Sequence, residues 1–286
     1  MEDSLTTAKS RLDLAVLNKI PKLSRSAITN LIKDGKVTVN GIVQQKSGFK
    51  VSDADKVLID FDLDQAKNPP AIKLPIVYED DDCIVINKPE GILTHSKGAF
   101  NPEATVASWL RPYLKDIVGD RAGIVHRLDR ATSGVMICAK TDQAMRWLQK
   151  QFSTRKVKKT YEAIINGSME PNQAVIDMPI ERNPKHPATF RVGHNGKQAL
   201  TAYETTQQTG KYTLLILKPT TGRTHQLRVH LSQLGHPIVG DVLYGGEPAD
   251  RLYLHAEELE ITLPNRERKT FFVPLPSSFE QLLEQA

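Results

Sequence analysis

The chain has 286 residues, of which 40% are hydrophobic and 25% charged, a composition typical of a globular protein and not of a disordered, collagen-like or membrane protein. Its length suggests two domains and allows a buried core without disulfides or structural metals. The 38 Lys and Arg residues exceed the 33 Asp and Glu residues by five, and residues 1–50 alone hold nine basic and four acidic side chains, a local excess of five.

Residues 10–33 predict two short helices. Apolar side chains follow the helical period from Leu12 to Ile20, and Pro21 ends this first segment. Ser24 is a suitable N-cap for the second helix.

A hairpin is expected at residues 37–43, where an Asn-Gly pair separates two β-prone runs. A further strand at residues 56–60 closes this small unit. The following polar, proline-rich stretch has the composition of a linker. The predicted organisation is therefore a first domain at residues 1–62, a linker at 63–74 and a second domain at 75–286.

The second domain is rich in strands, with a few helices scattered among them. This order favours an α+β fold over a repeating βαβ array. The expected strands are residues 76–78, 83–87, 135–139, 161–165, 201–206, 212–218 and 252–255, and the expected helices are residues 106–110, 143–151 and 226–234.

The cysteines and the apolar runs constrain where the protein works. Cys83 and Cys138 lie in apolar runs without metal-ligand spacing, so we expect buried packing residues rather than functional thiols. The absence of a disulfide pattern and of a secretory signal predicts the reducing cytoplasm. No apolar run approaches the roughly 18 residues of a membrane span, which argues against integral-membrane classes.

Basic residues gather in the first domain, where Arg25, Lys33 and Lys36 surround the second helix and the start of the hairpin. A helix with one packed and one cationic face can lie along a phosphate backbone, but a solvated surface helix has the same pattern. The run RLDLAVLNKIPKLSRSAITNLIKDGKVTVNG resembles the alpha-L RNA-binding motif, named after a small-subunit ribosomal protein. The resemblance implies that these three cations contact RNA.

Residues 123–140, GIVHRLDRATSGVMICAK, place one carboxylate, Asp129, beside His126, Arg127 and Arg130. Neighbouring guanidinium groups favour the ionised form of a carboxylate, which can serve as a nucleophile or base but not as a general acid. The surrounding positive charge suits a phosphodiester substrate. From these residues alone, an ordinary Arg–Asp surface pair is the more common explanation.

Three further segments carry chemistry-bearing residues. Residues 146–160 contain six cations and no carboxylate and lead into Tyr161, a pattern of a nucleic-acid backbone track beside a stacking platform or, alternatively, of a solvated helix end. Arg223 follows a glycine before a predicted helix, either within reach of a carboxylate or simply at the surface. The segment RLYLHA at 251–256 ends in an apolar strand that can equally belong to the core.

In chain order, the segments VINKPEGILTH, HRLDRATSG, KKTYEA, GRTHQLRVH and LHA resemble the RluA-type pseudouridine synthases. The resemblance runs from about residue 76 to the end and implies a mixed, mainly antiparallel catalytic sheet. It also implies isomerisation of uridine, which gains and loses no atoms and needs no cofactor or metal. Together with the first domain, it resembles the branch that modifies large-subunit ribosomal RNA.

The resemblance also implies roles for individual residues. Asp129 is the implied catalytic carboxylate, with its role as nucleophile or base left open. Arg223 is implied to pair with Asp129, and Arg127 to fill the gap that the departing uridine leaves. Tyr161 is implied to stack on the target base, and Leu254 to form an apolar wall of the pocket.

Arg155, Lys156 and Lys158 are further candidates for RNA contacts, and the expected partner is structured RNA, large-subunit ribosomal RNA or a ribosome precursor, bound by a monomer. Two alternatives are a non-catalytic RNA-binding or ribosome-assembly factor on the same scaffold, and a nucleosidase that releases free base. A nucleosidase usually needs two carboxylates, and these motifs supply only one, since Glu162 points to the strand face opposite Tyr161.

Overall fold

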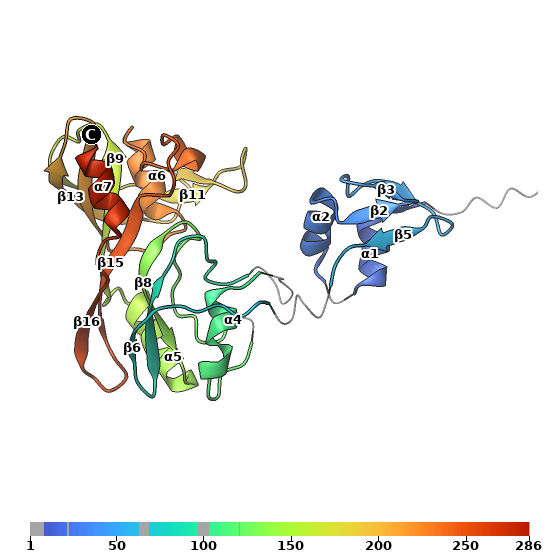
Figure 1. The fold of residues 1–286 in the computed structure, drawn as a ribbon, viewed down its shortest axis with the longest axis horizontal. Helices are drawn as coiled ribbons and strands as arrows, with labels where there is room; N and C mark the ends of the chain where they lie inside the picture. Colours follow the sequence, from blue (N-terminus) through green and yellow to red (C-terminus); the bar gives the residue numbers. More distant parts are fainter. Residues whose placement is uncertain (1–8, 22, 63–68, 97–102, 120, 286) are drawn as a thin grey trace, which may run out of the picture. The chain divides into compact units, whose positions relative to one another are not determined.

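The computed structural model describes residues 9–21, 23–62, 69–96, 103–119 and 121–285. The chain forms two compact units, one built chiefly on residues up to Ala71 and one on Ile72–His95 and Thr105–Ala286 (Figure 1). The predicted linker lies partly outside the described residues, and its described part, residues 69–74, contains no helix or strand. In the described part, no helix has the length and apolar character needed to span a membrane.

The first unit packs two helices against short antiparallel strands around its own apolar core. The side-chain oxygen of Ser24 caps the second helix by accepting a hydrogen bond from the backbone N–H of Ala27, 3.2 Å away. Asn40 and Gly41 take the positive φ values, 53° and 82°, that a tight hairpin turn requires. The elements are β1 (Ser10–Arg11), α1 (Leu12–Lys19), α2 (Arg25–Lys33), β2 (Val37–Val39), β3 (Ile42–Val43), β4 (Lys50–Val51) and β5 (Val57–Ile59).

The second unit is built on a nine-stranded sheet in the order β10-β13-β14-β9-β15-β8-β7-β6, with β16 paired to β15. Among the described strand pairs of this sheet, only β15 and β8 run parallel, so the prediction of a mixed, mainly antiparallel α+β fold is confirmed. The strands of this sheet are β6 (Ile76–Glu79), β7 (Cys83–Lys88), β8 (Ser133–Ala139), β9 (Lys158–Asn166), β10 (Gln173–Asp177), β13 (Leu200–Gln208), β14 (Tyr212–Pro219), β15 (Leu254–Thr262) and β16 (Arg268–Phe272). A separate two-stranded sheet pairs β11 (Ile180–Arg182) with β12 (Phe190–Val192).

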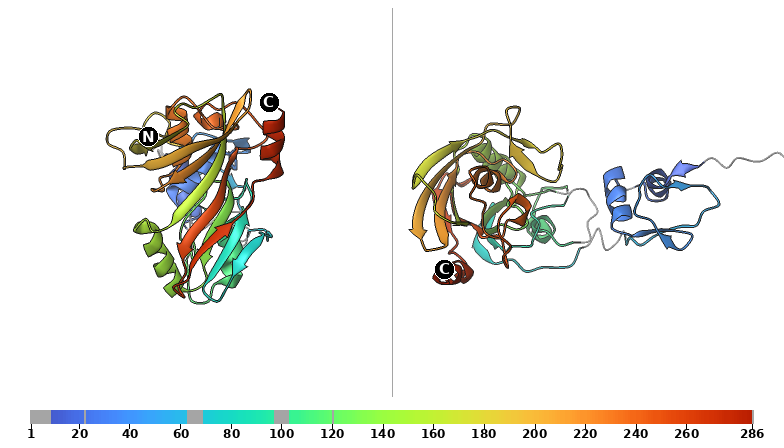
Figure 2. Two further views of the ribbon diagram at one scale, coloured as in Figure 1. Left: turned by 90° about the vertical axis from the view of Figure 1, so that its left-hand side faces the viewer. Right: turned by 90° about the horizontal axis from the view of Figure 1, so that it is seen from above.

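Helices pack against this sheet, and the buried apolar side chains between them form two clusters. One cluster joins β7 and β8 to α4 and α5, and the other joins β9 and β14 to α6 and α7. The long strands β9 and β15 run through the middle of the sheet, where the two clusters adjoin (Figure 2). The helices are α4 (Val106–Leu110), η1 (Arg111–Tyr113), α5 (Asp142–Ser153), α6 (Gln226–Gln233), η2 (Val242–Tyr244) and α7 (Ser277–Glu284).

The last predicted strand differs most from the structure. It was expected at residues 252–255, but β15 begins at Leu254 and continues to Thr262. The pairing of β15 with β9 shifts its register between Ala256 and Glu258. This shift breaks the alternation of side chains along the strand, so the sequence pattern does not reveal that the strand continues. Cys83 and Cys138 are both free and buried, which confirms their prediction as packing residues.

Candidate active site

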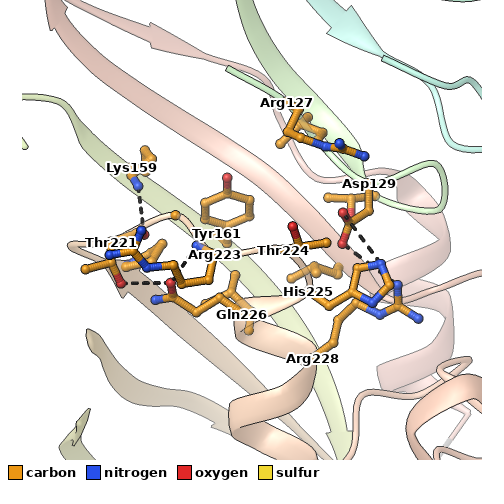
Figure 3. Close-up of a pocket in the computed structure, with 16 residues that line it drawn as sticks. Arg127, Asp129, Lys159, Tyr161, Thr221, Arg223, Thr224, His225, Gln226 and Arg228 are labelled. Carbon is orange, nitrogen blue, oxygen red and sulfur yellow. Dashed lines mark hydrogen bonds and ion pairs between the residues drawn. The ribbon is translucent and has the colours of Figure 1, made fainter. Parts of the chain in front are cut away.

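A small pocket of about 110 Å³ opens where the loop before β8, strand β9, the start of α6 and the start of β15 meet (Figure 3). The sequence-predicted residues Arg127, Asp129, Tyr161, Arg223 and Leu254 all line this pocket. Segments up to 127 residues apart in the chain therefore converge on one site, counting from Arg127 to Leu254.

The loop that carries Asp129 is anchored by a buried lysine. Lys88 is fully buried, and its ammonium group donates hydrogen bonds to the carbonyl of Arg130, at 3.3 Å, and to two carbonyls of the turn at residues 89–92. Burial lowers the pKa of Lys88 to about 8. On the other side of Asp129, the Thr94 hydroxyl donates to the carbonyl of Leu128 at 2.7 Å. The backbone on both sides of the carboxylate is thus fixed.

Gly134 allows the strand after this loop to approach β15 closely. Its φ is +117°, and a Cβ at this position would lie 2.1 Å from the carbonyl oxygen of Ala256. Gly134 and Ala256 face each other in the parallel pairing of β8 with β15. Only glycine fits here, so the glycine of the HRLDRATSG motif serves the geometry of the sheet beside the pocket.

The Asp129 carboxylate faces two nitrogen-bearing side chains of the segment around α6. Its Oδ2 lies 3.8 Å from Nη1 of Arg228, and its Oδ1 lies 3.9 Å from Nε2 of His225 (Figure 3). Arg228 is held by Asp241, which accepts from its Nε at 2.8 Å and from its Nη2 at 2.7 Å. Because two nitrogens of the guanidinium are fixed, the third is presented to Asp129.

The predicted pairing of Arg223 with Asp129 is wrong in this structure. The Nε of Arg223 donates to the backbone carbonyl of Gln198 at 3.0 Å, on the side of the pocket away from Asp129 (Figure 3). Arg223 precedes α6, whereas Arg228 lies within that helix and points to the Asp129 loop. The motif GRTHQLRVH holds both arginines, and the choice between them depends on which one faces the Asp129 loop in the fold.

Tyr161 and Leu254 form the floor of the pocket on neighbouring strands. Tyr161 pairs with Ala256, and Leu254 pairs with Ala163, so the tyrosine and the leucine share a sheet face. Burial, with a contribution from Asp129, raises the pKa of Tyr161 far above its ordinary value. The phenol therefore stays protonated at physiological pH and offers a flat ring and a hydroxyl group.

Glu162 takes no part in the pocket, as its strand position predicted. It does not line the pocket, it is buried, and burial beside Glu257 raises the pKa of Glu162 to about 7.

A larger groove of about 550 Å³ continues from the pocket and shares residues with it, among them Arg127, Lys159 and Arg223. Phe152 forms part of its wall and stacks on His126, with 4.6 Å between ring centroids. Burial lowers the pKa of His126 to about 3, so this histidine stays neutral and its Nε2 accepts a hydrogen bond from a backbone N–H. The groove thus combines an apolar wall with exposed cations.

The six candidate RNA contacts fall into two groups. Arg25 donates to Asp13 at 2.9 Å, Lys36 pairs with Asp60 at 2.7 Å, and Lys158 pairs with Glu260 at 3.0 Å. Within the described ranges, no ion pair is found for the remaining three, Lys33, Arg155 and Lys156. The described residues also contain no cluster of three or more His, Cys, Asp or Glu side chains suited to a metal ion.

Comparisons with known proteins match both units. Residues 82–233 match the RNA pseudouridylate synthase family, and residues 10–57 match the S4 domain. The chain is 41% identical to the ribosomal large subunit pseudouridine synthase D of Yersinia pestis, over 92% of this chain and 87% of the relative, and 38% identical to that of Escherichia coli strain K12, over 96% and 90%. The solved structure of human RNA pseudouridylate synthase domain containing 1 aligns with a TM-score of 0.60 and 29% identity, covering 75% of this chain and 96% of that one.

Proposed function

Because the chain belongs to the RNA pseudouridylate synthase family and carries an S4 domain, we propose that it converts specific uridines of large-subunit ribosomal RNA to pseudouridine. This membership confirms the resemblance found in the sequence motifs. We assign catalysis to residues 75–286 and RNA capture to residues 1–62, joined by a linker at 63–74. A ribosomal RNA substrate agrees with the cytoplasmic location expected from the sequence.

The observation that carries the proposal is the placement of Asp129 beside Arg228 and opposite Tyr161 in one small pocket. The isomerisation breaks the N1–C1′ bond of uridine, turns the base and joins C5 to C1′. C5 loses its proton and N1 gains one, either directly or by exchange with solvent. An ionised Asp129 supplies either the nucleophile or the base for these steps. The guanidinium of Arg228, 3.8 Å from Oδ2, stabilises the negative charge of Asp129.

The size of the pocket favours a flipped base as the bound group. Its volume of about 110 Å³ lies below the range of roughly 300–1,000 Å³ typical of sites for whole small molecules. A single pyrimidine is the part of the RNA that such a space accepts, and a base reaches it only by leaving its stack. We assign to Arg127, which lines the pocket and is exposed, the role of occupying the space that the base vacates.

The adjoining groove suits the sugar–phosphate backbone that flanks the flipped nucleotide. It is lined by Arg127, Arg155 and Lys159, and its volume of about 550 Å³ exceeds that of the pocket. Cations along a groove bind single strands by contact with successive phosphates. Lys156 and Lys158, next to Arg155 and Lys159 in the sequence, add positive charge beside this groove. Lys33 is the proposed RNA contact of the first unit.

The proposal is tested by incubating the purified chain with unmodified large-subunit ribosomal RNA and mapping pseudouridine, with transfer RNA and small-subunit RNA as controls. Pseudouridine at discrete positions of the large-subunit RNA is the expected result. Tight binding without conversion would instead support a non-catalytic assembly factor. Release of free uracil would support a nucleosidase.

A further inference from the structure

His225 occupies an unusual backbone conformation at the edge of the pocket. Its φ of 56° and ψ of 22° lie in the left-handed region, directly before the first residue of α6. A side chain strains the backbone there, and such strain persists mainly where the surroundings hold the residue for a function. Capping does not explain the choice of residue, since the imidazole makes no capping hydrogen bond to the helix.

The ring of His225 is fixed by two aromatic neighbours. Its ring centroid lies 5.5 Å from that of Tyr244 and 5.6 Å from that of Phe190, both in edge-on geometry. The Tyr244 hydroxyl lies 2.7 Å from Nδ1 of His225. The same hydroxyl oxygen accepts a hydrogen bond from the backbone N–H of Phe190 at 3.0 Å. The imidazole therefore has one orientation in the pocket wall.

These contacts also define the tautomer. With its oxygen accepting from Phe190, the Tyr244 hydroxyl has its own proton to donate, and Nδ1 of His225 is the acceptor at hand. Nδ1 is then unprotonated, and the ring proton of a neutral imidazole is on Nε2. Burial lowers the pKa of His225, with Asp129 and Asp241 opposing this shift and Arg228 and Arg127 adding to it, which keeps the ring neutral.

We propose that His225 is a positioning residue for Asp129, directing an Nε2–H donor to Oδ1 while Arg228 faces Oδ2. The inference rests on the proposed function of this pocket. The distances, 3.9 Å and 3.8 Å, place one donor group opposite each carboxylate oxygen. Contacts of this kind shorten when substrate fills an active site. Two donors on opposite oxygens define the rotation of the carboxylate, and hence the direction from which it meets the uridine.

Replacement by glycine separates this role from a structural one. His225→Gly relieves the left-handed strain, so the variant is expected to fold and to bind RNA with unchanged affinity. Its kcat is expected to fall by about ten- to a hundred-fold with little change in KM, the loss typical of one hydrogen bond to a charged group. Wild-type kcat in His225→Gly, together with inactivity of Asp129→Asn, would refute the positioning role and leave the proposed function intact.

Chemical rescue tests the two ring nitrogens directly. Added imidazole can accept from Tyr244 and donate to Asp129 at the same time, whereas N-methylimidazole fills the same space without an N–H donor. We expect imidazole to restore kcat of His225→Gly at least several-fold more than N-methylimidazole does. Equal effects of the two compounds, including no effect of either, would overturn the proposal.

Tyr244→Phe tests the tautomer. Loss of the hydroxyl removes the donor to Nδ1, so the nitrogen chemical shifts of His225 are expected to change from those of one tautomer to those of a mixture. The expected loss of kcat is smaller than for His225→Gly. Tyr203→Phe is the matched control, because that hydroxyl donates to the carbonyl of Pro171 and does not line the pocket. Unchanged shifts in Tyr244→Phe would contradict the proposed tautomer.

Discussion

The candidate RNA contacts of the two units differ in how many are ion-paired within the described residues. Two of three are paired in the first unit, where Lys33 is the exception, and one of three, Lys158, is paired in the second. In the first unit, Arg25 and Lys36 are engaged by Asp13 and Asp60. In the groove of the second unit, Arg127 and Arg155 have no ion pair among the described residues. Residues 1–50 of the first unit hold five more basic than acidic side chains. Net charge along a sequence therefore overstates the number of cations available to RNA, and pairing within the fold decides how many remain.

Arg228 shows the effect of pairing in the catalytic unit, because this buried cation is held by two hydrogen bonds to Asp241. Arg228→Met leaves Asp241 buried without its partner, so we expect the free energy of unfolding to fall by about 3–5 kcal/mol. Urea unfolding measures this change. Arg146→Met is the matched control, since its pair with Asp142 is exposed and is expected to contribute less than about 1 kcal/mol. Similar losses in the two variants would show that burial of the pair is unimportant.

Asp13 tests whether the paired cations of the first unit serve folding. Its side chain is buried and accepts hydrogen bonds from Arg11 and Arg25, so Asp13→Asn is expected to lower the free energy of unfolding of this unit by about 1.5–3 kcal/mol. Hydrogen bonds from Arg11 are the main cause that lowers the pKa of Asp13 from 3.8 to about 2.

The same residue predicts a pH dependence. The carboxylate stabilises the fold fully above its ordinary pKa of 3.8, and this stabilisation is lost as the pH falls through 3.8 toward 2. Melting temperatures of the wild type and of Asp13→Asn are therefore expected to converge over this range. A difference that stays constant down to pH 2 would contradict the account.

Of these variants, a substitution of Arg155 is expected to change the free energy of unfolding least, and it also changes RNA binding. It lies in the left-handed region with φ 57°, just beyond α5, where glycine is the favoured residue. Arg155→Gly is therefore expected to raise the free energy of unfolding by no more than about 1 kcal/mol while weakening RNA binding.

Salt dependence identifies the reason for that weakening. Loss of one phosphate contact lowers the slope of log affinity against log salt by about 0.7–0.9. Arg146→Ala removes the same charge from α5 outside the groove and is expected to leave the slope unchanged. Equal slopes for Arg155→Gly and the wild type would remove Arg155 from the proposed backbone track.

The sequence predicted those features that depend on local patterns. The Ser24 cap, the Asn-Gly hairpin and the α+β order follow from residue types at fixed spacing, and the motifs place Asp129 and Tyr161 in one pocket. Features that depend on long-range pairing were missed. Both the extension of β15 past its bulge and the choice of Arg228 over Arg223 require knowing which strand or loop lies opposite.

The central claim is that the Asp129 pocket performs the isomerisation. The most direct measurement compares pseudouridine formation in large-subunit ribosomal RNA by the wild type and by Asp129→Asn, which keeps the shape of the side chain and removes its charge. The account predicts that Asp129→Asn forms no pseudouridine while its affinity for the RNA stays close to that of the wild type. Conversion by Asp129→Asn at a rate near that of the wild type would contradict it.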